Sequence, residues 1–485
     1  MTSTAPARPS ALDRYFRISE RGSTVGTEIR GGLVTFFAMC YIIALNPLIL
    51  GTVKDGTGHF LADGNLAVIA AATSLVAGVM TILMGVVANF PLSIAAGLGL
   101  NAVVAFSIAA RPGVSWADAM GLVVLEGVVM LALVLTGFRT AMFRAVPQEL
   151  KVAISVGIGM FIALVGFVDS GFVRAGGGTP LSLGIDGSLA GWPILIFVIG
   201  LVLLLVLMIR KVRGAILIAI AAATILAVAA QSLFHVGAQG ADGSNPRGWS
   251  LNVPSFPGWG NLVDVPDLSI VGHFSLTGGI RELGILTVVL LVFSLVIADF
   301  FDTMGTMVAV GSEGKLLDAE GNPVGTKKIL VVDSVAAMAG GVGSVSSNTA
   351  FVESTTGVGD GARTGLSSVV TGVAFLLSMF AAPLVSMVPS EAAAPALVLV
   401  GFLMMTQVAG IDWKHWELAI PAFLTIVLMP FTYSITTGMG AGFIAYVILQ
   451  VAVGKARKVH PLLWIAAAAF VVYFALGPIE ELLNA

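Results

Sequence analysis

Long apolar runs separated by short polar segments fill nearly the whole chain. A bilayer-spanning helix needs about 20 apolar residues, and a polar stretch at 233–283 divides the runs into two equal groups. The first group lies near 31–50, 66–89, 92–109, 119–138, 150–168, 192–209 and 214–232. The second group lies near 285–310, 328–342, 349–360, 364–388, 394–409, 418–434 and 436–453. The pattern predicts an all-α polytopic membrane protein with fourteen transmembrane segments, seven in each half.

This pattern divides the chain into five predicted parts. They are a cytoplasmic N-terminal segment (1–30), a first seven-span repeat (31–232), an extracellular linker (233–283), a second seven-span repeat (284–454) and a C-terminal basic segment (455–485). The last part contains a further apolar run, 462–477, which is short for a span and fits a tilted or surface-lying helix.

Composition excludes an ordinary soluble domain. The 485 residues are 57% hydrophobic and 11% charged, whereas soluble proteins contain about 25% charged residues. The net charge of −3 suggests no nucleic-acid partner, and the single cysteine, Cys40, allows no internal disulfide.

Positive charge predicts the orientation. With a cytoplasmic N-terminus and fourteen crossings, the inner segments hold all of the 24 Lys and Arg residues except Lys54, Arg111, Arg174, Arg247 and Arg281. Such an inner excess is expected of cytoplasmic loops. The chain is therefore predicted to be a multi-pass protein of the cell membrane.

The two halves share a weak similarity. Val146-Pro147-Gln148-Glu149 matches Val388-Pro389-Ser390-Glu391, and at the same offset Gly159 matches Gly401. An odd number of spans per unit turns the second unit upside down, which gives the inverted repeats of alternating-access transporters. Chance similarity between two apolar runs is the alternative.

Two spans at equivalent positions are interrupted by polar and glycine residues. The third span contains Gly97, Gly99 and Asn101, and the tenth carries Glu353 within the sequence SSNTAFVESTTGVG. Irregular backbone at membrane depth is tolerated only where protein or a water-filled cavity satisfies it. Paired broken segments therefore point to the binding site of a transporter. For Asn101 the alternative is local hydrogen bonding at a helix break, and for Glu353 it is capping of a half-helix.

Two aspartates lie within the eighth span. A carboxylate in hydrocarbon costs about 2.5–3.5 kcal/mol on the insertion scale, so Asp299 and Asp302 indicate a pathway or a site. Being three residues apart, they are expected to share a helix face, and the nearby Thr303 and Thr306 extend that polar stripe. One acid is expected to touch the substrate and the other to hold the local structure. Glu126 and Asp333, which also lie in apolar runs, are interpreted as structural.

Several motifs together resemble one transporter family. They are LDRYFRISERGSTVGTEIRGGLVTFFAMCYIIALNP, GLGLNAVVAF, ADFFDTMGT, TAFVESTTGVGDGARTG and VGFLMM…IDW…AIPAFLTIVLMPFTYSI. In this order they resemble the AzgA-type purine permeases, which carry hypoxanthine, guanine and adenine. These permeases are a branch of the nucleobase–cation symporter/nucleobase–ascorbate transporter superfamily.

The resemblance implies two inverted seven-span repeats with short extended pieces in spans 3 and 10. It implies a core domain (spans 1–4 and 8–11), a gate domain (spans 5–7 and 12–14) and a homodimer. It also implies proton-coupled purine uptake, with binding positions at Asn101, Asp302 and Glu353 and at the neighbouring backbone of Ala350 and Phe351. No enzymatic activity and no cofactor are implied.

The chemistry of the residues agrees with that substrate class. A purine offers ring N–H donors and ring nitrogen acceptors, which match a carboxylate, a protonated carboxyl group or an asparagine amide. We therefore expect Asn101, Asp302, Ala350, Phe351, Glu353 and Thr306 to bind the base. Glu353, Asp302 and Asp299 are expected to carry the coupling proton, with sodium as the alternative ion.

Two rival functions use the same residues. A carrier of the same fold for uracil, xanthine or a small anion is the nearer rival, although the intramembrane acids and the absence of membrane Lys or Arg in the two broken spans argue against an anion. An intramembrane aspartyl protease is the remote rival, with Asp302 and Asp360 as a pair that activates water.

Overall fold

The computed structural model describes residues 10–136, 146–175, 179–212, 214–240, 244–256, 258, 260, 262–318 and 322–484. Residues 1–9 of the predicted N-terminal segment, the predicted end of the fourth span at 137–138 and the last residue of the C-terminal segment lie outside this range.

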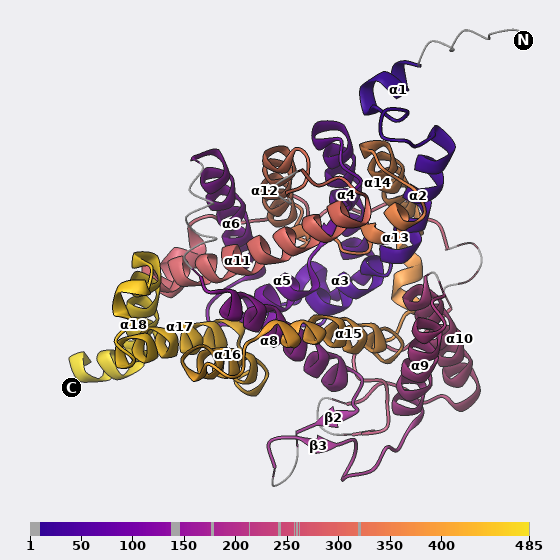
Figure 1. The fold of residues 1–485 in the computed structure, drawn as a ribbon. Helices are drawn as coiled ribbons and strands as arrows, with labels where there is room; N and C mark the ends of the chain where they lie inside the picture. Colours follow the sequence, from indigo (N-terminus) through magenta and orange to yellow (C-terminus); the bar gives the residue numbers. More distant parts are fainter. Residues whose placement is uncertain are drawn as a thin grey trace, which may run out of the picture.

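The described part of the chain is almost entirely helical (Figure 1). Ten of its helices are long and apolar enough to cross a membrane: Val25–Gly51, Leu66–Ala88, Trp116–Thr136, Gln148–Asp169, Trp192–Ile209, Ala215–Phe234, Gly278–Glu313, Gly365–Val385, Ser390–Gly410 and Ile435–Ala452. Shorter apolar helices cover Leu98–Ala109, Trp416–Phe431 and Pro461–Ala475. The prediction of an all-α membrane protein is confirmed.

The elements of the first half follow the apolar runs. They are α1 (Ala11–Phe16), α2 (Val25–Met39), α3 (Ile42–Gly51), η1 (Leu61–Gly64), α4 (Leu66–Leu83), η2 (Met84–Ala88), β1 (Ile94–Ala96), α5 (Leu98–Ala102), η3 (Val103–Ala109), α6 (Trp116–Thr136), α8 (Gln148–Asp169), β2 (Val173–Arg174), β3 (Ser182–Leu183), α9 (Trp192–Ile209) and α10 (Ala215–Phe234).

The elements of the second half are α11 (Gly278–Glu313), α12 (Thr326–Val342), β4 (Asn348–Ala350), α13 (Ser354–Gly359), α14 (Gly365–Ser378), η5 (Met379–Met387), α15 (Ser390–Met405), η6 (Thr406–Gly410), α16 (Trp416–Phe431), α17 (Ile435–Ala452), η7 (Ala456–Lys458) and α18 (Pro461–Asn484). The run 462–477 is therefore helical, and α18 packs on α17 through Phe470 and Phe443, whose ring centroids are 6.0 Å apart.

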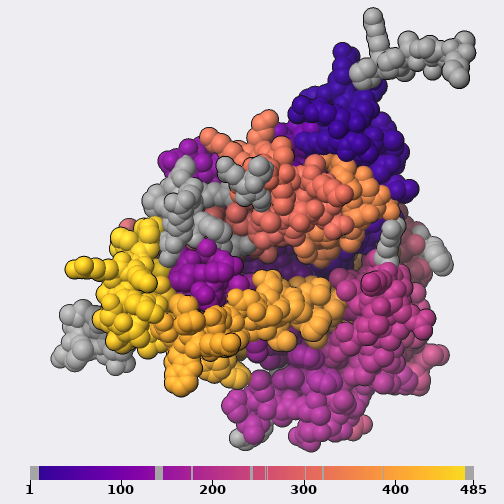
Figure 2. Space-filling view, in the orientation of Figure 1, coloured from indigo at the N-terminus to yellow at the C-terminus, as the bar shows by residue number. Residues whose placement is uncertain are grey.

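The helices form two groups that differ from their order in the chain. Helices α2, α4 and α6 pack with α11, α12 and α14, whereas α8, α9 and α10 pack with α15, and α16 and α17 pack on α8. Figure 1 shows the first group above the second. In Figure 2, dark purple residues of the first half are visible between the salmon surface of α11 and the orange surface of α15.

The N-terminal segment fastens the ends of two helices in the first group. The Tyr15 hydroxyl donates to the carbonyl of Val86 at 3.0 Å, and the Arg21 guanidinium donates to the carbonyls of Asn89 and Arg363. The Glu28 carboxylate accepts from the backbone N–H groups of Arg363 and Thr364. The segment thus joins the end of α4 to the start of α14.

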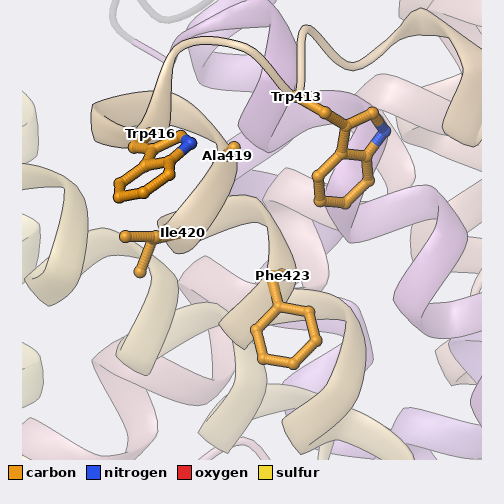
Figure 3. A pocket seen from close by; sticks show the side chains of 5 residues that line it. All are labelled: Trp413, Trp416, Ala419, Ile420 and Phe423. Atoms are coloured by element: carbon orange, nitrogen blue, oxygen red, sulfur yellow. The ribbon is translucent and has the colours of Figure 1, made fainter.

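Aromatic side chains surround a shallow hollow at the start of α16. The hollow has a volume of about 410 Å³ and is lined by Trp413, Trp416, Ala419, Ile420 and Phe423 (Figure 3). Tryptophan is enriched where a membrane protein meets the lipid–water interface. This surface therefore fits contact with lipid, and it lies apart from the broken spans.

Glycines let the α8 and α15 helices approach closely. A Cβ atom on Gly401 would lie 2.4 Å from the Gly159 carbonyl oxygen, and a Cβ atom on Gly159 would lie 2.9 Å from the Gly401 carbonyl oxygen. Small residues at such crossings permit backbone contact between membrane helices. The two glycines that match between the halves are therefore in contact with each other.

We expect Gly401→Ala to destabilise the protein, because its new methyl group meets a backbone oxygen that cannot move aside. Overpacking of this kind costs about 1–3 kcal/mol, which should lower the melting temperature of detergent-solubilised protein by about 2–4 °C. Gly26→Ala is the matched control, because a Cβ atom on this helical glycine meets no heavy atom within 4 Å. Equal melting temperatures for the two variants would contradict the close crossing.

Candidate functional site

Two short strands cross at the centre of the broken spans. Strand β1 pairs antiparallel with β4, with Ile94 opposite Ala350 and Ala96 opposite Asn348. Beyond the strands, the Gly97 N–H donates to the Ser347 carbonyl at 3.0 Å and the Phe351 N–H donates to the Ser93 carbonyl at 2.9 Å. The two interruptions therefore satisfy each other's backbone groups, as membrane depth requires. The predicted extended pieces in spans 3 and 10 are present.

A half-helix begins directly after each strand. Helix α5 starts at Leu98 and α13 starts at Ser354, and the Ser354 hydroxyl accepts a hydrogen bond from the Ser93 N–H at 3.0 Å. Gly97 makes this crossing possible, because a Cβ atom there would lie 2.8 Å from the Thr349 Cγ2 atom. Because the strands are antiparallel, the start of α5 lies beside Ser347 at the beginning of β4, whereas the start of α13 lies beside Ser93 at the beginning of β1.

Glu353 is held by a tyrosine from the first span. It precedes α13, but its side chain makes no capping hydrogen bond to that helix. Instead, the Tyr41 hydroxyl donates to Glu353 Oε1 at 2.5 Å. Tyr41 is buried at the break between α2 and α3. The carboxylate is therefore positioned by a side chain 312 residues away in the sequence.

Asp302 lies close enough to Glu353 for the two carboxyl groups to interact electrostatically, and Tyr41 also interacts with Asp302. The Asp302 residue is exposed, whereas Glu353 is half-buried. Thr306 is one turn along α11 from Asp302 and is buried. The structure thus brings together two of the predicted binding acids from α11 and the segment before α13.

Asp299 points to different neighbours, although it is only three residues from Asp302. Its side chain is fully buried and lies near the hydroxyls of Thr303 and Thr349. The Thr303 hydroxyl donates to Asp333 Oδ1 at 2.9 Å and shares a 2.7 Å hydrogen bond with Thr349. Asp299 and Asp302 are therefore adjacent on α11 but differ in surroundings, one enclosed and one accessible.

The remaining predicted binding residues surround the strand crossing. Asn101 is fully buried in α5, and neither its Oδ1 nor its Nδ2 atom has a hydrogen-bond partner among the described residues. Ala350 lies in β4 and Phe351 follows it, both buried, and the Phe351 N–H is occupied by Ser93. Asn101 therefore retains its full hydrogen-bonding capacity on the half-helix that follows β1.

Tyr41 is a site residue that the sequence pattern does not identify. It lies in the run MCYIIALNP, one of only 5 tyrosines in the chain. A phenol in an apolar run usually needs a hydrogen-bond partner when buried, and this was the available signal. Its partner follows only from the fold.

The protease hypothesis is wrong. Asp360 is bound by Arg30, whose Nε lies 2.5 Å from Asp360 Oδ2 and which also donates to the Asp360 carbonyl at 2.8 Å. Glu353 is the acid that interacts with Asp302. Within the described ranges, no group of three His, Cys, Asp or Glu residues could hold a metal ion.

Comparison with known proteins gives both family and fold. A family described as "Permease family" (Xan_ur_permease) matches residues 26–441. The guanine/hypoxanthine permease PbuG of Bacillus subtilis (strain 168) is 38% identical over 467 residues, which cover 96% of this chain and 99% of PbuG. The adenine permease AdeQ of Escherichia coli (strain K12) is 35% identical over 460 residues, 95% of each chain.

Two solved structures have a similar fold. The transmembrane domain of the cyanobacterium bicarbonate transporter BicA has a TM-score of 0.57 at 16% identity and covers 86% of this chain and 97% of its own. SLC26A9 has a TM-score of 0.60 at 12% identity and covers 91% of this chain and 67% of its own. At these identities the likeness shows the fold alone.

We expect Tyr41→Phe to weaken the hold on Glu353. A hydrogen bond to a charged group contributes about 1.5–3 kcal/mol, and the partial exposure of Glu353 places the loss at the lower end. The melting temperature of the purified protein should fall, whereas Tyr446→Phe should leave it unchanged, because the Tyr446 hydroxyl makes no hydrogen bond in the part of the chain that the structure describes.

A double-mutant cycle tests the assignment directly. Tyr41→Phe and Glu353→Gln should be strongly non-additive, because each removes the same interaction. Additive changes in melting temperature would show that the two residues act independently.

Proposed function

Since the chain belongs to the Xan_ur_permease family of permeases, we propose that it is a secondary active transporter that imports purine nucleobases by proton symport. Guanine and hypoxanthine are the first candidate substrates and adenine is the second. The observation that carries the proposal is the meeting of Asp302 and Glu353 beside two crossed strands between broken helices. PbuG and AdeQ, named as purine permeases, support the substrate class.

We infer fourteen membrane crossings in two inverted repeats, with the N-terminus in the cytoplasm. The ten long helices supply ten crossings, and the shorter elements built on η3, α12, α13 and α16 supply four. At 1.5 Å per residue, the 17 residues of α12 extend about 25 Å, close to the bilayer core. The contact between Gly159 and Gly401 and the antiparallel pairing of β1 with β4 support a two-fold relation between the repeats.

The site chemistry suits a small neutral heterocycle. A carboxylate of Glu353 or Asp302 accepts hydrogen bonds from purine ring N–H groups, and an asparagine amide such as Asn101 both donates and accepts. Such sites usually combine a few convergent polar groups with apolar walls, and Ala350 and Phe351 provide apolar surface here. Glu353 is the principal base-reading group in this proposal, and Asp302 supports it.

Alternating access follows from the two helix groups. The binding acids belong to the group that contains α11 and α13, whereas α8 and α15 belong to the other group. Rocking of one group against the other would expose the site to each side in turn, as in transporters with inverted repeats. The proton neutralises one of the intramembrane carboxyl groups while the base is carried, and sodium is the alternative ion.

The second candidate is a carrier of another substrate on the same fold. BicA is a bicarbonate transporter, and one relative of this chain bears the name putative xanthine/uracil permease. In the described residues, neither Asp302 nor Glu353 forms a salt bridge with Lys or Arg. Two acids without a cationic partner disfavour a small anion, so uracil and xanthine are the stronger alternatives.

An uptake panel separates these substrates. Protein reconstituted into liposomes should accumulate labelled guanine or hypoxanthine when the interior is more alkaline than the medium, and it should ignore bicarbonate and sulfate. Transport of uracil without any purine would refute the purine assignment, and uptake driven only by a sodium gradient would refute proton coupling.

We expect Glu353→Gln to weaken purine binding about 10–100-fold, because loss of a charge-assisted hydrogen bond costs about 1.5–3 kcal/mol. Isothermal titration with guanine or hypoxanthine measures this change. Glu20→Gln is the control, because its exposed ion pair with Arg17 contributes little. If Glu353→Gln bound and transported the base as the wild type does, Glu353 would not be the base-reading residue.

A further inference from the structure

A second pair of acids lies inside the first helix group. Glu126 of α6 and Asp299 of α11 interact electrostatically, and both side chains are fully buried. None of their four carboxyl oxygens has a hydrogen-bond partner among the described residues. Asp302, in contrast, is exposed and interacts with Glu353. Helix α11 therefore carries one enclosed acid, Asp299, and one accessible acid, Asp302.

The groups around this pair are acids and hydroxyls. Asp333 of α12 interacts with Glu126 and accepts a hydrogen bond from Thr303. The Ser347 hydroxyl, just before β4, is fully buried beside Glu126, and the two groups do not form a hydrogen bond of normal geometry. A buried hydroxyl and a buried carboxyl group that lie together without a well-formed hydrogen bond are a second sign of a binding site.

Within the described part of the chain, every titratable group that interacts with the pair is acidic. They are Asp302 on α11 itself and Asp333 on α12, while β4 provides only Thr349 and Asn348. Lys327 and Lys328 lie at the start of α12, before Asp333, and neither is among the groups that interact with Glu126 or Asp299. An isolated buried charge is strongly unfavourable, and such groups neutralise unless they are paired. The cluster therefore requires a positive charge from outside the protein.

A proton satisfies this requirement better than a metal ion. Among the residues described, no three His, Cys, Asp or Glu side chains have the arrangement of a metal site. A proton needs only two facing carboxyl groups, because two close acids cannot both ionise and one retains its proton. A proton bound to either acid also supplies the donor that these oxygens lack.

We propose that Glu126 and Asp299 form a second proton-binding site, and that Glu126 holds the coupling proton while Glu353 and Asp302 hold the base. This proposal rests on the proposed function. It names the residue that couples proton movement to movement of the base. Glu126 acts as a positioning residue, since it influences the base site through Asp299 and does not touch the base.

The connection between the two sites is short. Asp299 is one helical turn from Asp302, so a movement of α11 caused by the pair is carried to the base site. Thr303 links α11 to Thr349 of β4, which pairs with β1 beside the half-helix of Asn101. Loss of the proton would leave two like charges between α6 and α11 and would push these helices apart. Proton occupancy thus sets the position of Asp302.

The first test needs no purine. Full-length purified protein in detergent is melted between about pH 5.5 and about pH 8.5 in potassium salts. The wild type should lose stability as the pH rises, because deprotonation leaves buried like charges, and Glu126→Gln should show a flatter profile. Glu126→Asp should restore the slope, and Glu20→Gln should match the wild type. Equal slopes for wild type and Glu126→Gln would overturn the proposal.

A comparison of sodium salts with potassium salts in the same melting experiment identifies the coupling ion. Replacing potassium by sodium should leave the melting temperature unchanged at each pH. A sodium-dependent rise that Glu126→Gln abolishes would show a sodium site in place of the proton site and would overturn the proposal. If Glu126→Gln fails to fold, Asp299→Asn carries the same melting test.

The second test measures coupling in liposomes. An inside-alkaline gradient of about one pH unit sustains about tenfold accumulation by a one-to-one proton symporter. Glu126→Gln should keep base affinity within about twofold but lose the accumulation and equilibrate the base instead. Accumulation at the wild-type level would overturn the proposal. If the wild type transported no purine, the proposed function would fail, while the pH profile of melting would still report on Glu126.

Discussion

The bilayer permits no unpaired backbone polar groups, and the architecture of this site follows from that constraint. Two spans are interrupted, and each interruption exposes N–H and C=O groups at depth. Strands β1 and β4 satisfy these groups by pairing, since each strand supplies the backbone hydrogen-bond partners that the other lacks. Neither half of the protein could hold its broken span alone. The strand pair is consequently shared between the two halves of the chain.

The same crossing explains why so many polar side chains lie in one small region. Once the strands are paired, Thr303 and Thr349 connect β4 to α11, and Tyr41 connects the broken first span to the segment before α13. The hydrogen bonds of Thr303 hold α11 against β4 and α12, and on this helix Asp302 is accessible while Asp299 is enclosed. One helix thereby carries an accessible acid and an enclosed acid one turn apart.

Much of the fold and part of the site could be predicted from the sequence. The apolar runs indicated the helices, and Gly97 and the polar residues before Glu353 indicated the extended pieces, because both effects are local. The proximity of Asp302 to Glu353 could be expected, since acids rarely occur in apolar runs without a shared purpose. The partner of Tyr41 could not, because a hydrogen bond between distant residues depends on the packing of α2, α11 and α13. The ion pair of Asp360 with Arg30 was hidden for the same reason. Helix α11 includes residues from Gly278, but Gly284 has a non-helical backbone (φ 75°, ψ 159°), so the apolar part of the helix begins after this break, where the apolar run at 285 predicts it.

The contact between Gly159 and Gly401 has a consequence for the origin of the chain. A residue that meets its own counterpart lies on a two-fold axis, which is the relation found in the isologous interface of a homodimer. Before the two halves were joined, a single seven-span unit could have formed the same contact with a second copy inserted in the opposite direction. A glycine at one position of the shorter gene would then have supplied both sides of the interface, and gene fusion would have preserved it as an internal contact.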